Sequence, residues 1–223
     1  MTSNGRDDFF ALIHKGQRRE LFAAIVKAGT LDWSDRSDAA AFERYWIEIH
    51  RMLVGHAKQE ETHFFPLLNE WTSELIDAEH AVHADLDRAL TELTRLVGAT
   101  AAAPTLEAGL SVYRRLTEFV ANYLLHQLEE ETIVMPAIWQ HCTDEEIEAA
   151  RSRFVSGQAP EGVVRSRRAV LPAISRSERA AMLATLRASR PAAFDAAMAD
   201  AERLLEPVDW DHLNQDLALT AVD

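Results

Sequence analysis

Apolar residues recur at intervals of three and four along most of the chain, which is the spacing of one face of an α-helix. We therefore predict four long helices, separated by polar or glycine-containing segments. Their approximate ranges are 8–27, 39–65, 73–97 and 106–139. Two helical hairpins of similar length in succession favour an up-down-up-down four-helix bundle. The pattern thus predicts an all-α fold, with residues 1–150 forming the bundle.

The second and fourth predicted helices carry the same pattern, displaced by the 70 positions that separate His56 from His126. In each helix, a histidine in the apolar face is followed by a glutamate four residues later and a proline ten residues later. The matched pairs are His56 with His126, Glu60 with Glu130, and Pro66 with Pro136. We expect each proline to end or kink its helix, since proline has no amide hydrogen to donate. We also expect the apolar face of the fourth helix to continue through Ile133.

The hydrophobic pattern changes after Cys142, the single cysteine of the chain. A short helix is expected over residues 144–154, followed by a linker at 157–172 that contains glycine, proline and several arginines. We interpret residues 151–223 as a helical C-terminal extension, which packs on the bundle or on a partner protein. A second copy of the chain is one such partner, so a homodimer is among the expected assemblies.

Two helices of the extension have clear start signals. Ser175 and Glu178 have the spacing of a capping box, in which each side chain bonds the backbone amide of the other residue. The helix that they open is predicted to extend to about residue 189. Pro191 suits the first position of the next helix, where its missing amide hydrogen is not needed, and that helix is predicted to extend to about residue 205.

Charge and composition exclude several kinds of partner. Acidic residues outnumber basic ones by 36 to 23, and the formal net charge of −13 disfavours binding to nucleic acid or to an anionic membrane surface. No run of apolar residues approaches the roughly 18 needed to span a membrane. A single cysteine permits no disulfide within the chain, and the first ten residues lack the features of a signal peptide. We therefore expect a cytoplasmic protein with no nucleic-acid and no membrane partner.

The repeated histidine–glutamate pairs indicate a metal site. Residues four apart on a helix lie about 40° apart around its axis and roughly 6 Å along it, so their side chains can converge on one ion. Burial of an unpaired carboxylate is costly, and two facing glutamates repel one another. A dication between Glu60 and Glu130 removes both penalties. Imidazole together with carboxylate suits iron, manganese or zinc.

The other two helices are expected to supply the remaining ligands. His14 is the histidine in the apolar face of the first helix, and His80 and His83 lie three residues apart on the third. His83 is aligned with the apolar face, which favours it as a ligand. The glutamates that follow each pair, Glu61 and Glu131, are expected to face solvent or to reach the edge of the metal site.

These segments together resemble the hemerythrin-like family, whose members carry the HHE cation-binding domain. The resemblance covers roughly residues 8–142 and rests on four segments. They are His14 in IHKGQRREL, HAKQEETHFFPLL at 56–68, Glu79-His80 in AEHAVHADL, and HQLEEETIVMPAI at 126–138. Members of the family hold two iron ions in an antiparallel four-helix bundle. The resemblance implies that Glu60 and Glu130 bridge the irons and that the histidines are terminal ligands.

The spacing of the histidines departs from that of the oxygen-carrying hemerythrins. Those proteins have two histidines four apart on the third helix and a longer histidine-to-aspartate spacing on the fourth. Here the third-helix spacing is three, and the fourth helix has His-x3-Glu. The family pattern favours His80 as a ligand, whereas the apolar pattern favours His83. We favour His80 and keep His83 as a further candidate. The expected metal ligands are His14, His56, Glu60, His80, His83, His126 and Glu130.

Three functions are compatible with these residues. The first is a di-iron protein that binds dioxygen, nitric oxide or peroxide, with enzymatic turnover left open and with zinc or manganese as substitute metals. The second is a sensor in which the iron centre gates an interaction made by residues 151–223. The third is iron buffering, which is less favoured because a lone bundle forms no storage cage.

Overall fold

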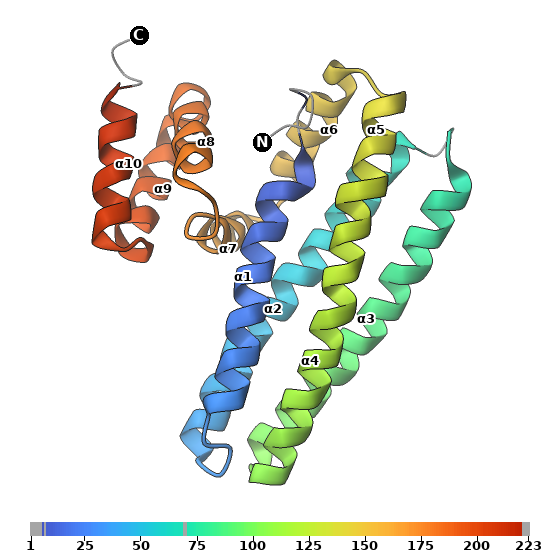
Figure 1. The fold of residues 1–223 in the computed structure, drawn as a ribbon, viewed down its shortest axis with the longest axis vertical. Coiled ribbons are helices and arrows are strands. Elements are labelled where there is room, and N and C mark those ends of the chain that lie inside the picture. Colours follow the sequence, from blue (N-terminus) through green and yellow to red (C-terminus); the bar gives the residue numbers. More distant parts are fainter. Residues whose placement is uncertain (1–5, 7, 69–70, 220–223) are drawn as a thin grey trace.

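The computed structural model describes residues 6, 8–68 and 71–219, and four long helices of this part form an antiparallel bundle (Figure 1). They are α1 (Phe9–Thr30), α2 (Arg36–His63), α3 (Ser73–Ala102) and α4 (Leu106–Glu129). α4 continues through a π-helical segment, η3 (Glu130–Val134), into α5 (Met135–His141). The predicted all-α bundle is confirmed, and the described residues contain no strand.

The ends of two helices show how local sequence sets their length. α2 ends at His63 and passes into a short 3₁₀ helix, η2 (Phe65–Leu67), which contains the Pro66 that was expected to end it. α3 is longer than predicted, because alanines and threonine after Gly98 carry the helix on to Ala102. Alanine is the strongest helix former, and it offsets the cost of the glycine.

Pro136 does not end the fourth helix, because a π-helical turn precedes it. In η3 the amide of Met135 donates to the carbonyl of Glu130, five residues earlier, where an α-helix would use the residue four earlier. The wider turn shifts the register of all that follows. Ile133 is 48% exposed, whereas Val134 is fully buried. The predicted continuation of the apolar face through Ile133 is therefore wrong.

Two apolar clusters fill the bundle, one on each side of a layer of polar side chains. The larger contains Trp46, Leu53 and Phe119, and the smaller contains Phe10 and Phe65. Between them lies a group of histidines and glutamates, each at most 6% exposed. Its members are His14, His56, Glu60, Glu79, His83, His126 and Glu130. None of the described helices is both long and apolar enough to cross a membrane.

The C-terminal extension is helical, including most of the segment predicted as a linker. It comprises α6 (Asp144–Gly157), α7 (Pro160–Val170), α8 (Arg176–Ser189), α9 (Pro191–Leu204) and α10 (Pro207–Leu219). The linker prediction is wrong over α7, because Pro160 starts a helix that packs against α1. A Cβ atom at Gly16 of α1 would lie 3.0 Å from the backbone of Ala169 and Val170, so the glycine permits this close approach.

α8, α9 and α10 pack on one another around an apolar cluster of their own and lie beside the bundle (Figure 1). The predicted capping box at Ser175 and Glu178 and the predicted helix start at Pro191 are both confirmed. A salt bridge joins this group to the bundle, since Lys15 Nζ of α1 lies 2.5 Å from Glu178 Oε1. The predicted division of the chain at residue 150 lies inside α6 and stays a prediction.

Candidate metal centre

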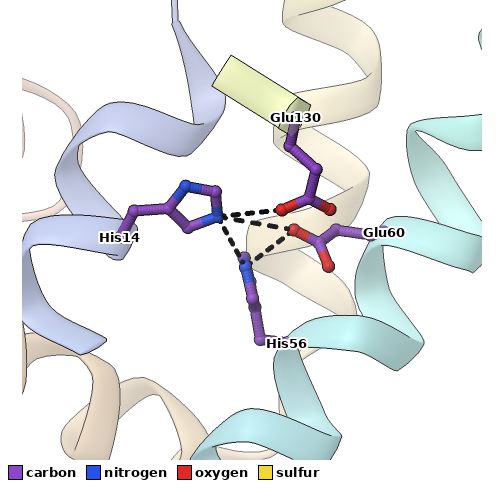
Figure 2. A group of neighbouring side chains, drawn as sticks. All are labelled: His14, His56, Glu60 and Glu130. Atoms are coloured by element: carbon purple, nitrogen blue, oxygen red, sulfur yellow. Dashed lines mark hydrogen bonds and ion pairs between the residues drawn. The ribbon is translucent and has the colours of Figure 1, made fainter. Parts of the chain in front are cut away.

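His14, His56, Glu60 and Glu130 converge from three parts of the bundle (Figure 2). His14 comes from α1 and Glu130 from η3. α2 supplies His56 and Glu60, which lie one helical turn apart. His56 Nε2 lies 2.7 Å from Glu60 Oε1 and 3.1 Å from His14 Nε2. The same nitrogen of His14 lies 3.3 Å from Glu130 Oε2. One atom from each residue lies within 4.8 Å of the others, a spacing that suits donors around one ion.

Glu79, His83, His126 and Glu130 form a second cluster. α3 supplies Glu79 and His83, and α4 supplies His126. His126 Nε2 lies 3.3 Å from Glu130 Oε1, and His83 Nε2 lies 3.7 Å from the same oxygen. Glu79 Oε2 lies 3.5 Å from His126 Nδ1. The four donor atoms again lie within 4.8 Å of one another, so their spacing suits a second ion.

Two carboxylates face both clusters. Glu130 has Oε2 toward His14 and Oε1 toward His126, each at 3.3 Å from the ring Nε2. Glu60 Oε1 belongs to the first cluster, whereas its Oε2 lies 3.9 Å from His83 Nε2 in the second. A carboxylate with one oxygen toward each of two donor clusters has the orientation that a bridging ligand needs.

Several buried polar atoms of the clusters lack partners within the protein, which fits a bound cation. Both carboxylate oxygens of Glu130 and one oxygen of Glu79 have no hydrogen-bond partner in the described part of the chain. The same holds for His83 Nε2. Unpaired buried acceptors are costly and rare in folded proteins, and facing carboxylates repel. Dications that accept nitrogen and oxygen donors would satisfy these atoms.

Two further glutamates bond the outer nitrogens of cluster histidines. Glu131 Oε1 accepts a hydrogen bond from His14 Nδ1 at 2.9 Å and another from Arg18 at 2.7 Å. Glu61 Oε1 accepts from His83 Nδ1 at 3.0 Å. Such bonds orient a histidine and leave its Nε2 for a metal. Glu61 faces solvent as expected, with 43% of its side chain exposed, and it also bonds His83. Glu131 is 21% exposed and turns toward His14, so the expectation of a solvent-facing side chain is corrected there.

The charge balance of the centre favours added positive charge. Burial opposes protonation of His14, but the negative charge of the surrounding Glu130, Glu131 and Glu60 outweighs it and raises the pKa of His14 to about 10. Burial also opposes protonation of His83, whose carboxylate neighbours raise its pKa to about 9. Burial, together with the nearby charge of Glu130, raises the pKa of Glu79 to about 7. An excess of buried carboxylate contributes to all three raised pKa values, and a metal ion would neutralise it.

The structure brings together six of the seven residues predicted as ligands. They are His14, His56, Glu60, His83, His126 and Glu130. His80 is exposed and lies outside both clusters, and its ring packs edge-on against Phe65 at 5.4 Å. The structure therefore places His83, and not His80, at the centre. The ligand role of each residue stays a prediction.

Glu79 is absent from the predicted ligands, although it is buried in the second cluster. It lies four positions before His83, so the third helix carries Glu-x3-His, the reverse of the His-x3-Glu pairs on the other two helices. It also lies three positions after buried Ile76, in the same apolar face. The spacing rule applied in both directions would have identified it.

The fold and the two clusters define a metal-binding protein built on a four-helix bundle. The chain matches the family model described as hemerythrin HHE cation binding domain over residues 7–149. Because this match covers more than half of the chain, the protein belongs to the hemerythrin HHE cation-binding domain family. No curated protein and no solved structure gives a significant match. The resemblance inferred from the sequence is thus confirmed, and the matched range contains both clusters.

Proposed function

We propose that this protein holds a pair of iron ions and uses them to bind dioxygen, nitric oxide or peroxide. The observation that carries the proposal is the orientation of Glu60 and Glu130, each with one carboxylate oxygen toward each cluster. Both carboxylates would then contribute to holding both ions. His14 and His56 would complete the site of one ion, and Glu79, His83 and His126 would complete that of the other.

The donor set supports iron and leaves room for an added ligand. Imidazole and carboxylate together suit iron, with zinc and manganese as substitutes. His14, His56, Glu60 and Glu130 would give one ion four protein donors, and Glu79, His83, His126 and Glu130 would give the other ion four. Because iron accepts about six donors, both sets would leave positions for an added ligand. Bound iron supplies redox chemistry at these positions.

A small cavity beside the second cluster supports a ligand of a few atoms. It has a volume of about 40 Å³ and is lined by His83 and His126 together with Leu53, Leu90 and the ring of Tyr123. A cavity needs roughly 10–15 Å³ to hold a water molecule, so this one accommodates little more than a diatomic molecule. Its mostly apolar wall favours uncharged ligands of the size of dioxygen, nitric oxide or hydrogen peroxide.

Anaerobic reconstitution with ferrous iron tests the proposal. The purified chain is expected to bind two irons, and exposure to dioxygen, nitric oxide or peroxide should then change its visible absorption. His56→Ala and His126→Ala should each lose iron, whereas His80→Ala serves as the control because His80 lies outside both clusters. Absence of iron uptake, or full uptake by both cluster variants, would contradict the proposal.

A further inference from the structure

A cavity of about 580 Å³ lies between α2 and the first helices of the extension, and His56 forms part of its wall. It is distinct from the 40 Å³ cavity, which lies against His83 and His126. Binding sites for small organic molecules have volumes of roughly 300–1,000 Å³, so this cavity has the size for such a ligand. It meets the candidate metal centre at the cluster that contains His14 and His56.

The bundle and the extension each build one wall of this cavity. Met52 and Gln59 of α2 lie on one side, and Phe154 of α6 and Ser166 of α7 contribute to the other. Both α6 and α7 pack directly on α2, which holds the walls in place. The family match ends at residue 149, so the second wall comes from outside the hemerythrin domain.

Two glycines keep the cavity open. Gly55 on α2 and Gly162 on α7 both line it, and a Cβ atom on either would meet no other atom within 4 Å. Glycine is unfavourable within a helix, and close packing does not require it at these two positions. Gly109 is different, because a Cβ atom there would lie 2.0 Å from Trp33. Gly55 and Gly162 therefore leave space that a ligand can occupy.

The cavity carries an excess of positive charge, although the formal net charge of the chain is −13. Arg51, Lys58 and Arg165 line it, against one lining carboxylate, that of Glu161. Both arginines bond the same neighbouring carboxylate, Glu48, so one negative charge serves two guanidinium groups. A concave site with a net positive lining attracts anions, and guanidinium and ammonium groups form strong hydrogen bonds to carboxylates.

We propose that this cavity binds a small organic carboxylate beside the metal centre. The carboxylate group pairs with the cationic side chains, and the carbon skeleton fills the space above Gly55 and Gly162. The two walls of the cavity, its open space and its positive lining are present without a metal, so binding of the carboxylate does not depend on one. Only the position of the bound carboxylate beside a metal ion at His56 rests on the proposed function.

Isothermal titration calorimetry of the full chain, both iron-loaded and metal-free, provides the test. Glutarate and benzoate are the probes, and the uncharged glutaramide and benzamide are their matched controls. At least one acid is expected to bind both forms of the protein, and its amide is expected to bind at least about tenfold more weakly. Failure of both acids to bind, or equal binding of acid and amide, would overturn the inference.

Substitutions that fill the cavity locate the binding site. Gly162→Leu should weaken acid binding by at least about tenfold with iron content and helicity unchanged, since its side chain enters open space. Gly55→Leu fills the cavity from the α2 wall and gives an independent second test. Gly98→Leu on α3, away from the cavity, is the control for an added leucine in a helix, and its Cβ atom would lie 3.2 Å from the end of the Glu43 side chain. Wild-type acid binding by both cavity variants would overturn the assignment.

The charge contribution is tested by Lys58→Gln, with Lys27→Gln as the control because Lys27 does not line the cavity. Lys58→Gln should weaken acid binding and Lys27→Gln should not. Equal effects of the two substitutions would contradict the proposed pairing of the carboxylate with Lys58. Iron content measured on the same samples separates the two hypotheses. Acid binding without iron uptake refutes the proposed function alone, and iron uptake without acid binding refutes this inference alone.

Discussion

His14 donates a hydrogen bond from Nδ1 to Glu131 Oε1 at 2.9 Å, across the contact between α1 and η3. Arg18 donates to the same carboxylate oxygen at 2.7 Å, so the glutamate is held from two sides. The relationship recurs between α3 and α2, where His83 Nδ1 donates to Glu61 at 3.0 Å. In both cases the glutamate directly follows one that belongs to the clusters, and it fixes the histidine of the adjacent helix.

Replacement of this outer carboxylate should weaken metal binding without removing a ligand. Glu131→Gln is expected to lower iron affinity by roughly 10- to 100-fold, because a carboxylate bonded to the outer nitrogen orients the histidine and raises its basicity. Competition with a chelator of known affinity measures the change. Glu129→Gln, at an exposed neighbouring position, is the control. Equal affinities for the two variants would show that the His14–Glu131 bond has no such role.

The third helix allows a direct comparison of two histidines. His83→Ala is expected to lose iron from the second cluster, because its Nε2 lies 3.7 Å from Glu130 Oε1 and has no hydrogen-bond partner in the described residues. His80→Ala is expected to retain full iron content, because His80 is exposed. Metal analysis of both variants gives the answer. Iron loss from His80→Ala but not from His83→Ala would show that His80 is the ligand, as the family pattern predicts.

The stability of the metal-free protein should fall as the pH rises above neutrality. The pKa values of His14 and His83 are raised from 6.5 to about 10 and about 9, so the stability from their protonation is complete below about pH 6.5 and lost as pH rises through those values. The pKa of Glu79 is raised from 4.5 to about 7, and its ionisation over that interval destabilises the fold in the same direction.

A bound dication replaces those protons, so the loaded protein should not lose stability in this way. The difference in melting temperature between zinc-loaded and metal-free protein is therefore expected to widen from pH 6 to pH 9. Thermal unfolding of both forms across this interval is the measurement. A constant or shrinking difference in melting temperature would mean that the raised histidine pKa values do not determine how the stability of the metal-free protein depends on pH.

The extension depends on one buried carboxylate. Asp200 of α9 is 1% exposed and accepts hydrogen bonds from Arg167 and Arg168 of α7 and from Arg203. Asp200→Ala should destabilise the protein by roughly 3 kcal/mol, because the partly buried Arg167 loses its counter-charge. Denaturant unfolding measures the loss, with exposed Asp195→Ala as the control. Equal stabilities of the two variants would contradict this account.

The bundle could be predicted from the sequence because each long helix has one apolar face, and the spacing of that face is a local property. The pairs His56/Glu60 and His126/Glu130 were found for the same reason. The buried positions later in the fourth helix were not predicted correctly, because the π-helical turn at Glu130 shifts the register. No residue type in that segment indicates a π-helical turn.

Contacts between distant segments explain the remaining differences. α7 was expected to be a linker, since its glycine, proline and arginines suggest a loop, but packing against Gly16 of α1 stabilises a helix there. The family pattern favoured His80, whereas the arrangement of α3 against α2 and α4 brings His83 inward. Prediction of Glu79 would have required a search for Glu-x3-His as well as for His-x3-Glu. The two repeated pairs show only the second order.

The central claim is that Glu130 bridges two ions, and the iron content of two variants tests it most directly. Glu130 belongs to both clusters, whereas Glu79 belongs to one. After anaerobic reconstitution, Glu130→Ala is expected to lose both irons, and Glu79→Ala is expected to keep the iron held by His14 and His56. Retention of one or two irons per chain by Glu130→Ala would contradict the bridged pair.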